Sequence, residues 1–394
     1  MSDAGVRTGI AVAVDGDRIA ALGTPSVIER DFPDAEVVDC AGKVLTPGLV
    51  DSHTHAVFGR PRFDEQELRA AGAGYMEIAE RGGGIHSSVR DLRGRSEADL
   101  VALTRARLRR LAHYGTTTIE VKSGYGLTVE DELKTLQVIA QLQRETTLRL
   151  VPTWLGAHEI PIEHRARSDG RADYIEQVVH EQLPMVAAQG VARFADVFCE
   201  PGVFTIAETR TILAAARARG LGLKLHADEL EPCGGAELAA QLGATSADHL
   251  AAISPAGIDA LARSNTVATM LPGTMFFLGR SRQAPARELI GAGAIVALAT
   301  DFNPGTSPTP NFPLIMTMGV SQLHMSVAEV MLAATVNGAA ALGLAESIGQ
   351  IAPGFSADIA LWDCEDVREI PYWYGDARCA ASWCRGGLVQ SAWE

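Results

Sequence analysis

The sequence predicts an α/β fold: a (β/α)8 barrel, or TIM barrel, with a small β-sandwich domain built from both chain termini. The chain has 394 residues, more than the roughly 250 that one barrel uses. Apolar strand-type runs alternate with helical segments through its middle, and turn-rich strands occupy both ends. We expect residues 1–48 and 350–394 to form the small domain and residues 49–349 the barrel. A doubly wound sheet is disfavoured because the chain has no GxGxxG motif or P-loop.

The small domain is predicted from similar patterns at the two ends of the chain. In residues 9–23, the Asp15-Gly16 step lies between two apolar runs, which indicates a hairpin. Residues 348–363 carry a strand after a Gly-Pro turn, and residues 384–391 resemble another strand and turn. We therefore expect the two ends to share one small sheet, with the barrel inserted between them.

The barrel is predicted from eight apolar runs with helical segments between most of them. Three helices are expected to begin at Ser96, Thr128 and Thr205, each followed three residues later by an acidic residue. Gly220 is expected to close the third of these helices. Eight such strands alternating with helices predict a closed parallel sheet. The runs cover residues 44–55, 116–124, 148–158, 194–200, 221–229, 244–250, 266–273 and 294–303.

The strongest local motif is Asp51-Ser52-His53-Thr54-His55. Residues two apart on a strand point to the same side, so His53 and His55 are expected to project together. Two convergent imidazoles at the end of the first barrel strand form half of a metal site. The motif alone also fits two unrelated histidines.

Other strand ends carry matching residues. His226 ends the fifth run, His249 the sixth and Asp301 the eighth. Barrel enzymes place their chemistry at these carboxyl ends. Together with His53 and His55, this pattern favours a shared metal site over five separate packing residues. We expect one ion bound by the two first-strand histidines, His226 and Asp301.

Three of these side chains receive catalytic roles in this interpretation. Asp301 is expected to accept a proton from water, whose pKa a bound metal lowers to about 7. His249 is expected to polarise the substrate or orient the water. Glu229, three residues after His226, is expected to be a general acid/base, although it also fits a solvated loop acid.

The order of these residues is similar to that of the amidohydrolase superfamily. Across residues 41–363 the chain resembles the imidazolonepropionase family more closely, in EVKSGYGL (120–127), KLHADELEPCGG (224–235) and TDFNPGTSP (300–308). The resemblance implies hydrolysis of 4-imidazolone-5-propanoate to N-formimidoyl-L-glutamate in histidine degradation. It also implies one divalent or trivalent metal ion, zinc or iron, and an unmodified Lys122.

The same resemblance implies a set of substrate contacts. Arg62 suits the propanoate carboxylate as a bidentate fork, and Tyr125 is expected to reach the same group. Without the resemblance, Arg62 equally fits a surface ion pair and Tyr125 a buried loop anchor. The Gly82–84 run is interpreted as a lid over the site. The implied contacts are Arg62, Tyr125, His158, Glu229, Asn303, Gly305 and Thr306.

Composition limits the other possibilities. The chain has 34 Lys and Arg against 48 Asp and Glu, a net charge of −14, which argues against general affinity for nucleic acid or anionic membranes. Six scattered cysteines without a CxxC pair, no signal peptide and no apolar run of about 20 residues predict a cytoplasmic protein. We expect a small-molecule substrate and, from base rates, a homodimer.

Two competing functions stay open at this point. One is a deaminase of the same superfamily acting on a neutral base, against which Arg62 with Tyr125 argues because they suit an anionic tail. The other is a non-catalytic binding barrel, which is expected to lack metal ligands that this chain retains.

Overall fold

The computed structural model describes residues 5–73, 78 and 82–391. Its centre is an eight-stranded sheet in the order β11-β10-β9-β8-β7-β6-β5-β4, with neighbouring strands parallel. All eight predicted runs contribute a strand, which confirms the barrel. The strands are β4 (Leu49–Asp51), β5 (Thr116–Lys122), β6 (Arg149–Ala157), β7 (Phe194–Cys199), β8 (Gly222–Ala227), β9 (Ser246–His249), β10 (Val267–Met270) and β11 (Val296–Leu298).

The barrel closes just beyond the ends of its first and last strands. Thr54 and Phe302 form a parallel bridge. The backbone N–H of Asp301 donates to the carbonyl of His53 at 3.0 Å, and that of His55 donates to the carbonyl of Phe302 at 2.9 Å. The residues that close the barrel are therefore the proposed metal ligands themselves or their direct neighbours in the chain.

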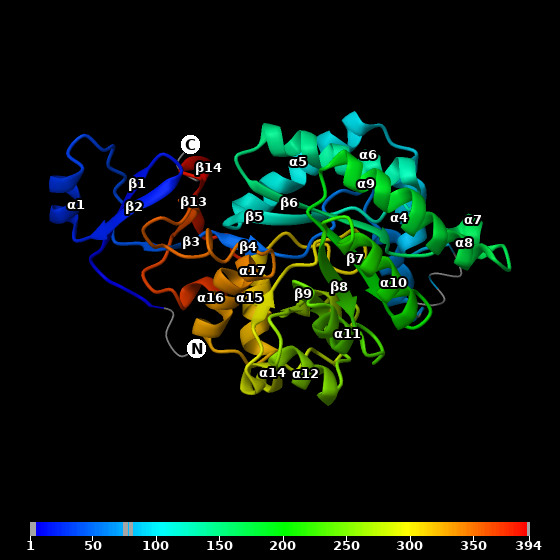
Figure 1. Cartoon of the computed structure of the whole chain (residues 1–394). Coiled ribbons are helices and arrows are strands. Elements are labelled where there is room, and N and C mark those ends of the chain that lie inside the picture. Colours follow the sequence, from blue (N-terminus) through cyan, green and yellow to red (C-terminus); the bar gives the residue numbers. More distant parts are fainter. Residues whose placement is uncertain (1–4, 74–77, 79–81, 392–394) are drawn as a thin grey trace.

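Helices surround the barrel (Figure 1). As predicted, Ser96 and Thr128 accept hydrogen bonds from the backbone three residues ahead, and Thr205 forms a complete capping box with Glu208. The helices are α2 (Phe63–Ala70), α4 (Ile85–Arg93), α5 (Glu97–His113), α6 (Val129–Glu145), α7 (Ile162–Arg165), α8 (Gly170–Gln177), the π-helix η1 (Val178–Gln182), α9 (Leu183–Gln189), α10 (Ile206–Arg217), α11 (Gly235–Leu242), α12 (Pro255–Ala262), α13 (Pro272–Phe277), α14 (Ala286–Ala292), α15 (Phe312–Ser321), α16 (Val327–Ala334), α17 (Val336–Ala340) and α18 (Glu369–Tyr372).

A separate antiparallel sheet combines both ends of the chain in the order β14-β13-β12-β3. β3 (Val44–Pro47) comes from the N-terminal part, and β12 (Ile359–Trp362), β13 (Cys379–Cys384) and β14 (Gly387–Ser391) come from the C-terminal part. The first predicted run therefore contains two strands, because β3 and β4 belong to different sheets. Gly48 separates them, and a Cβ there would collide with the side chain of Thr117.

The N-terminal hairpin differs from the single sheet that we expected. β1 (Ala11–Asp15) and β2 (Arg18–Gly23) pair only with each other among the named strands of the described residues, and α1 (Pro25–Asp31) follows them. Hydrogen bonds from Ile19 N to Phe355 O (2.9 Å) and from Gly354 N to Ile19 O (2.8 Å) attach the hairpin to the turn before β12. The hairpin and α1 project from one end of the molecule (Figure 1). The domain boundaries at 48/49 and 349/350 remain a prediction.

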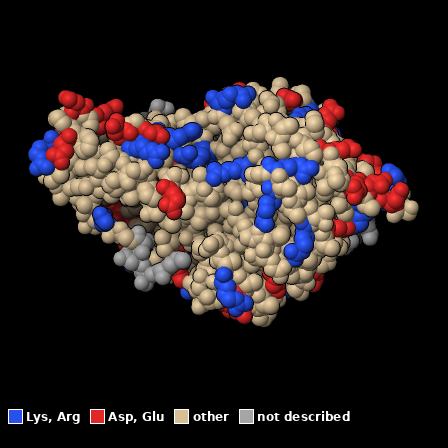
Figure 2. Space-filling view, viewed as in Figure 1, with Lys and Arg blue, Asp and Glu red and all other residues tan. Residues whose placement is uncertain are grey.

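Charged side chains of both signs are distributed over the face drawn in Figure 2. The excess of acidic residues therefore does not produce a surface of one sign on this face. Among the described residues, no helix has the length and apolar character needed to cross a bilayer.

Candidate active site and metal centre

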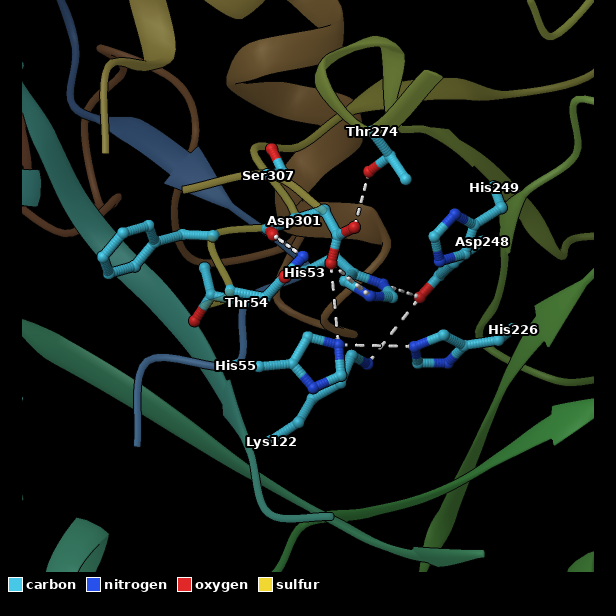
Figure 3. A network of polar contacts seen from close by, with 12 residues as sticks. His53, Thr54, His55, Lys122, His226, Asp248, His249, Thr274, Asp301 and Ser307 are labelled. Carbon is cyan, nitrogen blue, oxygen red and sulfur yellow. Dashed lines mark hydrogen bonds and ion pairs between the residues drawn. The ribbon is translucent and has the colours of Figure 1, made fainter. Parts of the chain in front are cut away.

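Three imidazoles and one carboxylate meet at the carboxyl ends of the barrel strands. His53 and His55 follow β4, His226 lies in β8 and Asp301 follows β11. The Nε2 atoms of His55 and His226 are 3.4 Å apart. Oδ1 of Asp301 lies 3.5 Å from Nε2 of His53 and 3.6 Å from Nε2 of His55. The structure thus brings together the four residues that the sequence proposes as ligands, as Figure 3 shows.

These separations fit a single metal ion. Four bonds of about 2.1 Å in tetrahedral geometry place the ligand atoms roughly 3.4 Å apart. Nε2 of His53 is buried and has no hydrogen-bond partner among the described residues, so its lone pair is available. The wider group of closely spaced potential ligands also includes His158 and His249. Three nitrogens and one carboxylate oxygen suit zinc and iron alike.

Two buried aspartates orient the histidines from behind. Oδ2 of Asp248 lies 2.7 Å from Nδ1 of His53, and Oδ2 of Asp196 lies 2.9 Å from Nδ1 of His226. The hydrogen bond to Asp248 keeps the ring proton of His53 on Nδ1 and turns its Nε2 towards the other proposed ligands. Asp196 also accepts the backbone N–H of His226 at 3.1 Å. Our sequence analysis missed both aspartates. The available signal was an acidic residue inside a buried strand, in β7 and in β9.

Burial shifts the pKa values of the histidines and of the aspartate in opposite directions, and it favours the neutral form of both. It is the largest cause lowering the pKa of His53 and of His55 well below the usual value, followed by nearby cationic and imidazole groups. Neutral imidazole is the form that binds a metal. Burial also raises the pKa of Asp301 to about 6, and a 2.5 Å hydrogen bond from Oγ1 of Thr274 opposes this shift.

Lys122 lies near the proposed ligands within a fully buried ion network. Its Nζ is 2.7 Å from Oδ2 of Asp196 and 2.8 Å from Oε2 of Glu120, and Nζ of Lys224 is 3.2 Å from Oε1 of Glu120. Burial by itself lowers the pKa of Lys122, but the surrounding carboxylates outweigh it and raise the pKa above the usual value. Carbamylation requires a free amine, so this arrangement supports an unmodified Lys122.

A cavity opens at the carboxyl ends of the strands. It gathers most of the side chains that the sequence assigned to the site, from loops far apart in the chain. His53 and Gly305 do not line it, although His53 lies beside Asp301 and Gly305 beside Arg62. The assigned residues in its wall are His55, Arg62, Tyr125, His158, His226, Glu229, His249, Asp301, Asn303 and Thr306.

Arg62 supplies a cation to the wall of this cavity. Its side chain is 7% exposed, and its Nε lies 3.8 Å from Oε1 of Glu65. Among the described residues, its Nε and Nη1 atoms have no hydrogen-bond partner. A surface ion pair therefore does not describe this residue. Buried donors without acceptors are costly, so the geometry favours an anionic ligand at this point.

Tyr125 and His158 stand beside the proposed metal ligands. The ring of His158 stacks on that of His55 with centroids 5.0 Å apart, and Tyr125 lies 5.3 Å from His158. Burial lowers the pKa of His158 to about 3, so its ring is neutral. Buried Glu132 accepts hydrogen bonds from the N–H groups of residues 124, 126 and 127, which fixes the loop that carries Tyr125.

The turn after Asp301 is organised by Asn303. Its Oδ1 accepts hydrogen bonds from the N–H groups of Gly305 and Thr306, both at 2.8 Å, and its Nδ2 donates to the Asp301 carbonyl and to Oγ1 of Thr306. The amide of Asn303 is therefore fully used inside the turn. Gly305 provides space for Arg62, because a Cβ at this position would overlap its guanidinium.

Glu229 and His249 face each other across the site, with Oε2 and Nε2 3.5 Å apart. Burial is the main cause that raises the pKa of Glu229 well above its usual value, followed by repulsion from Asp301 and Glu200. The raised pKa favours the protonated form of Glu229, which is the form able to donate a proton. His249 and Asp301 have φ values of 81° and 51°, a strained backbone of the kind that clusters at functional sites.

The glycine run lies directly before α4. Gly82 and Gly84 have φ values of 81° and 67°, and the N–H of Gly84 donates to Oε1 of Glu65 at 2.7 Å. The run is thus connected to the side chain that flanks Arg62. Its movement as a lid remains a prediction.

Comparison with known proteins identifies close relatives in sequence. The amidohydrolase family model matches residues 65–389, and a model of the bacterial imidazolonepropionase-like composite domain matches residues 11–35. An imidazolonepropionase from Bacillus velezensis is 45% identical over 375 residues, covering 95% of this chain and 88% of the relative. One from Symbiobacterium thermophilum is 47% identical over 393 residues, covering 99% and 92%.

Solved structures share the fold at lower identity. A zinc-bound adenosine deaminase from Xanthomonas campestris superposes with a TM-score of 0.74 at 18% identity, covering 97% of this chain and 88% of that one. The guanine deaminase of E. coli gives a TM-score of 0.71 at 18% identity, covering 97% and 92%. At this identity, the likeness concerns the fold alone.

Proposed function

The chain belongs to the amidohydrolase family and, within it, to the imidazolonepropionases, and on this premise we propose that it hydrolyses 4-imidazolone-5-propanoate to N-formimidoyl-L-glutamate. In this reaction water adds to the ring carbonyl carbon, the ring C–N bond breaks, and the released nitrogen takes up a proton. The observation that carries the substrate assignment is buried Arg62. It lies at a cavity shared with three of the proposed metal ligands, and its Nε and Nη1 atoms have no hydrogen-bond partner within the part of the chain that the structure describes.

Arg62 binds the propanoate carboxylate in this proposal, and Tyr125 lines the same cavity. His158, neutral and stacked on His55, is placed for contact with the imidazolone ring. Asn303 lines the cavity and also holds the turn that contains Thr306. The substrate contact that the resemblance implies for Asn303 stays part of the proposal.

The catalytic assignments follow from charge and position. His53, His55, His226 and Asp301 would hold one zinc or iron ion, which supplies a water of pKa about 7. Asp301 takes the proton of the attacking water. Glu229 delivers a proton to the departing ring nitrogen, and His249 beside it polarises the carbonyl or orients the water.

The test is turnover by the purified protein. We expect loss of imidazolonepropionate absorbance together with formation of N-formimidoyl-glutamate, and metal analysis showing one ion per chain. The superfamily alternative, a deaminase, predicts ammonia release from adenine, guanine or cytosine instead. Base deamination without opening of the imidazolone would overturn the proposal.

The cellular setting is also a proposal. We infer a cytoplasmic homodimer from the sparse unpaired cysteines and from the base rate for enzymes of this size. Light scattering of the purified protein measures its mass. A value near the 41.7 kDa of one chain would contradict the dimer.

A further inference from the structure

The loop after β8 is wrapped around one buried carboxylate from the neighbouring strand. Glu200 follows β7 directly and is 4% exposed. Its Oε2 accepts a hydrogen bond from the N–H of Glu229 at 3.1 Å. Its Oε1 accepts from the N–H groups of Leu230 at 3.2 Å and Glu231 at 2.8 Å. Three successive backbone donors thus converge on one side chain, which is the geometry of an anion-binding nest.

The nest fixes the backbone of the residue that we propose as the acid/base. Among the described residues, the Glu229 carboxylate accepts no hydrogen bond from the protein, and its polar contact is the 3.5 Å approach to His249. Packing and the local backbone therefore decide where this carboxylate points. Glu200 sets that backbone from outside the loop.

A second acidic residue, Asp228, holds the later part of the same loop, so the two parts of the loop have different anchors. Asp228 accepts hydrogen bonds from the N–H groups of Cys233, Gly234, Gly235 and Ala236, which fastens the start of α11. Glu200 is the residue that holds the three positions beginning at Glu229. It does not line the cavity and is not among the closely spaced potential metal ligands.

We propose that Glu200 is a positioning residue for catalysis, which holds Glu229 at the distance and angle required for proton transfer to the departing nitrogen. The inference rests on the proposed function. A displacement of about 1 Å at a proton donor costs much more in turnover than in substrate binding, because the proton moves only in the transition state.

The experiment compares Glu200→Gln with the wild-type chain and with a matched control. Glu329→Gln is the control, since Glu329 also accepts a backbone N–H, that of Ser326 at 2.7 Å, but at the start of α16 and outside the cavity. For Glu200→Gln we expect kcat to fall about 10- to 100-fold, less than the roughly 100- to 10,000-fold that general acid–base catalysis contributes, because Glu229 is displaced and not removed. We expect KM to change less than about threefold and metal content to stay unchanged. The control is expected to keep both constants.

A double-mutant cycle with Glu229→Gln separates positioning from general damage. If Glu200 acts through Glu229, then adding Glu200→Gln to Glu229→Gln lowers kcat no further. Equal fractional losses in both backgrounds would overturn the inference. Glu200→Asp keeps two acceptor oxygens and is expected to lose less activity than Glu200→Gln. It also provides the test if the glutamine variant fails to fold.

The outcomes of this experiment distinguish the two proposals. A wild-type chain that does not open the imidazolone refutes the proposed function, and the role of Glu200 with it. If the wild type is active and the kcat losses of Glu200→Gln and Glu229→Gln multiply in the double variant, only the positioning role is refuted. Hydrogen exchange provides a further check. The amides of residues 229–231 should exchange faster in Glu200→Gln than in the wild type, and at the wild-type rate in Glu329→Gln.

Discussion

Arg62→Ala tests the substrate assignment most directly. The guanidinium is buried at the cavity wall, and its Nε and Nη1 atoms have no acceptor among the described residues. Each charge-assisted hydrogen bond contributes about 1.5–3 kcal/mol. Two such bonds from Arg62 to the substrate carboxylate would contribute about 3 kcal/mol to binding. This figure allows for the 3.8 Å pairing with Glu65, which weakens when the substrate binds. At 1.4 kcal/mol per factor of ten, we expect KM to rise about 100-fold.

The assay follows imidazolonepropionate loss at several substrate concentrations, with metal content measured on the same samples. Arg62→Ala should retain its metal, because Arg62 is not among the closely spaced potential ligands. An analogue without the propanoate carboxylate should be turned over equally slowly by wild type and variant. Wild-type KM in Arg62→Ala would refute the role of this arginine as the carboxylate anchor.

Gly305→Ala tests the position of the Arg62 guanidinium without substituting the arginine itself. The new Cβ would overlap the guanidinium and force it to move, so we expect a rise in KM of similar direction and unchanged metal content. Gly291→Ala is the matched control, because no atom lies within 4 Å of its added methyl group. If Gly305→Ala raises KM no more than Gly291→Ala does, the position of the guanidinium is not what binds the substrate.

Three further predictions concern the metal and stability. Asp248→Asn should weaken metal affinity about 10- to 100-fold, measured by competition with a chelator, because Asp248 orients His53; unchanged affinity contradicts this. Lys122→Met should cost about 3–5 kcal/mol in urea unfolding by leaving buried carboxylates unpaired; a cost below 1 kcal/mol contradicts a paired network. Burial, followed by nearby arginines, lowers the pKa of His86 to about 4, whereas the unfolded chain takes up this proton below about 6.5. Stability therefore falls between pH 6.5 and 4, and His86→Gln should flatten this fall in pH-dependent unfolding; parallel curves contradict it.

Regular features of the fold could be predicted from the sequence because they depend on local pattern. Each of the eight apolar runs contributes a barrel strand, and Ser96, Thr128 and Thr205 cap helices as expected. The first run misled because β3 and β4 are continuous in apolar character. The close packing of Gly48 against Thr117 marks the change of sheet, and that contact joins residues far apart in the chain.

The convergent part of the site could also be predicted, since strand ends of a parallel barrel open on one face. His53, His55, His226 and Asp301 were placed by this rule, and their atoms lie 3.4–3.6 Å apart in the pairs measured. Their roles as ligands await metal analysis. The rule identifies which residues lie at the carboxyl ends of the strands. It does not identify the hydrogen bonds and ion pairs that orient their side chains.

The supporting residues could not be predicted in the same way, because their partners lie on other strands. Asp248 contacts His53 across 195 positions of the chain, and Lys122 contacts Asp196 across 74. A charge within a buried strand is nevertheless a visible signal, since ionised groups are rarely buried unless they are paired. Glu120 and Lys122 share one face of β5 by their spacing of two.

Pairing among these buried charges links the proposed metal site to the stability of the barrel. Each histidine ligand held by a carboxylate requires that carboxylate to remain ionised, and Lys122 with Lys224 supplies the opposing charge below. Loss of either lysine would leave a negative charge without compensation beneath the site. The strands that deliver the ligands and the ions that orient them therefore form one unit, so substitutions inside the barrel should change metal affinity without touching the metal.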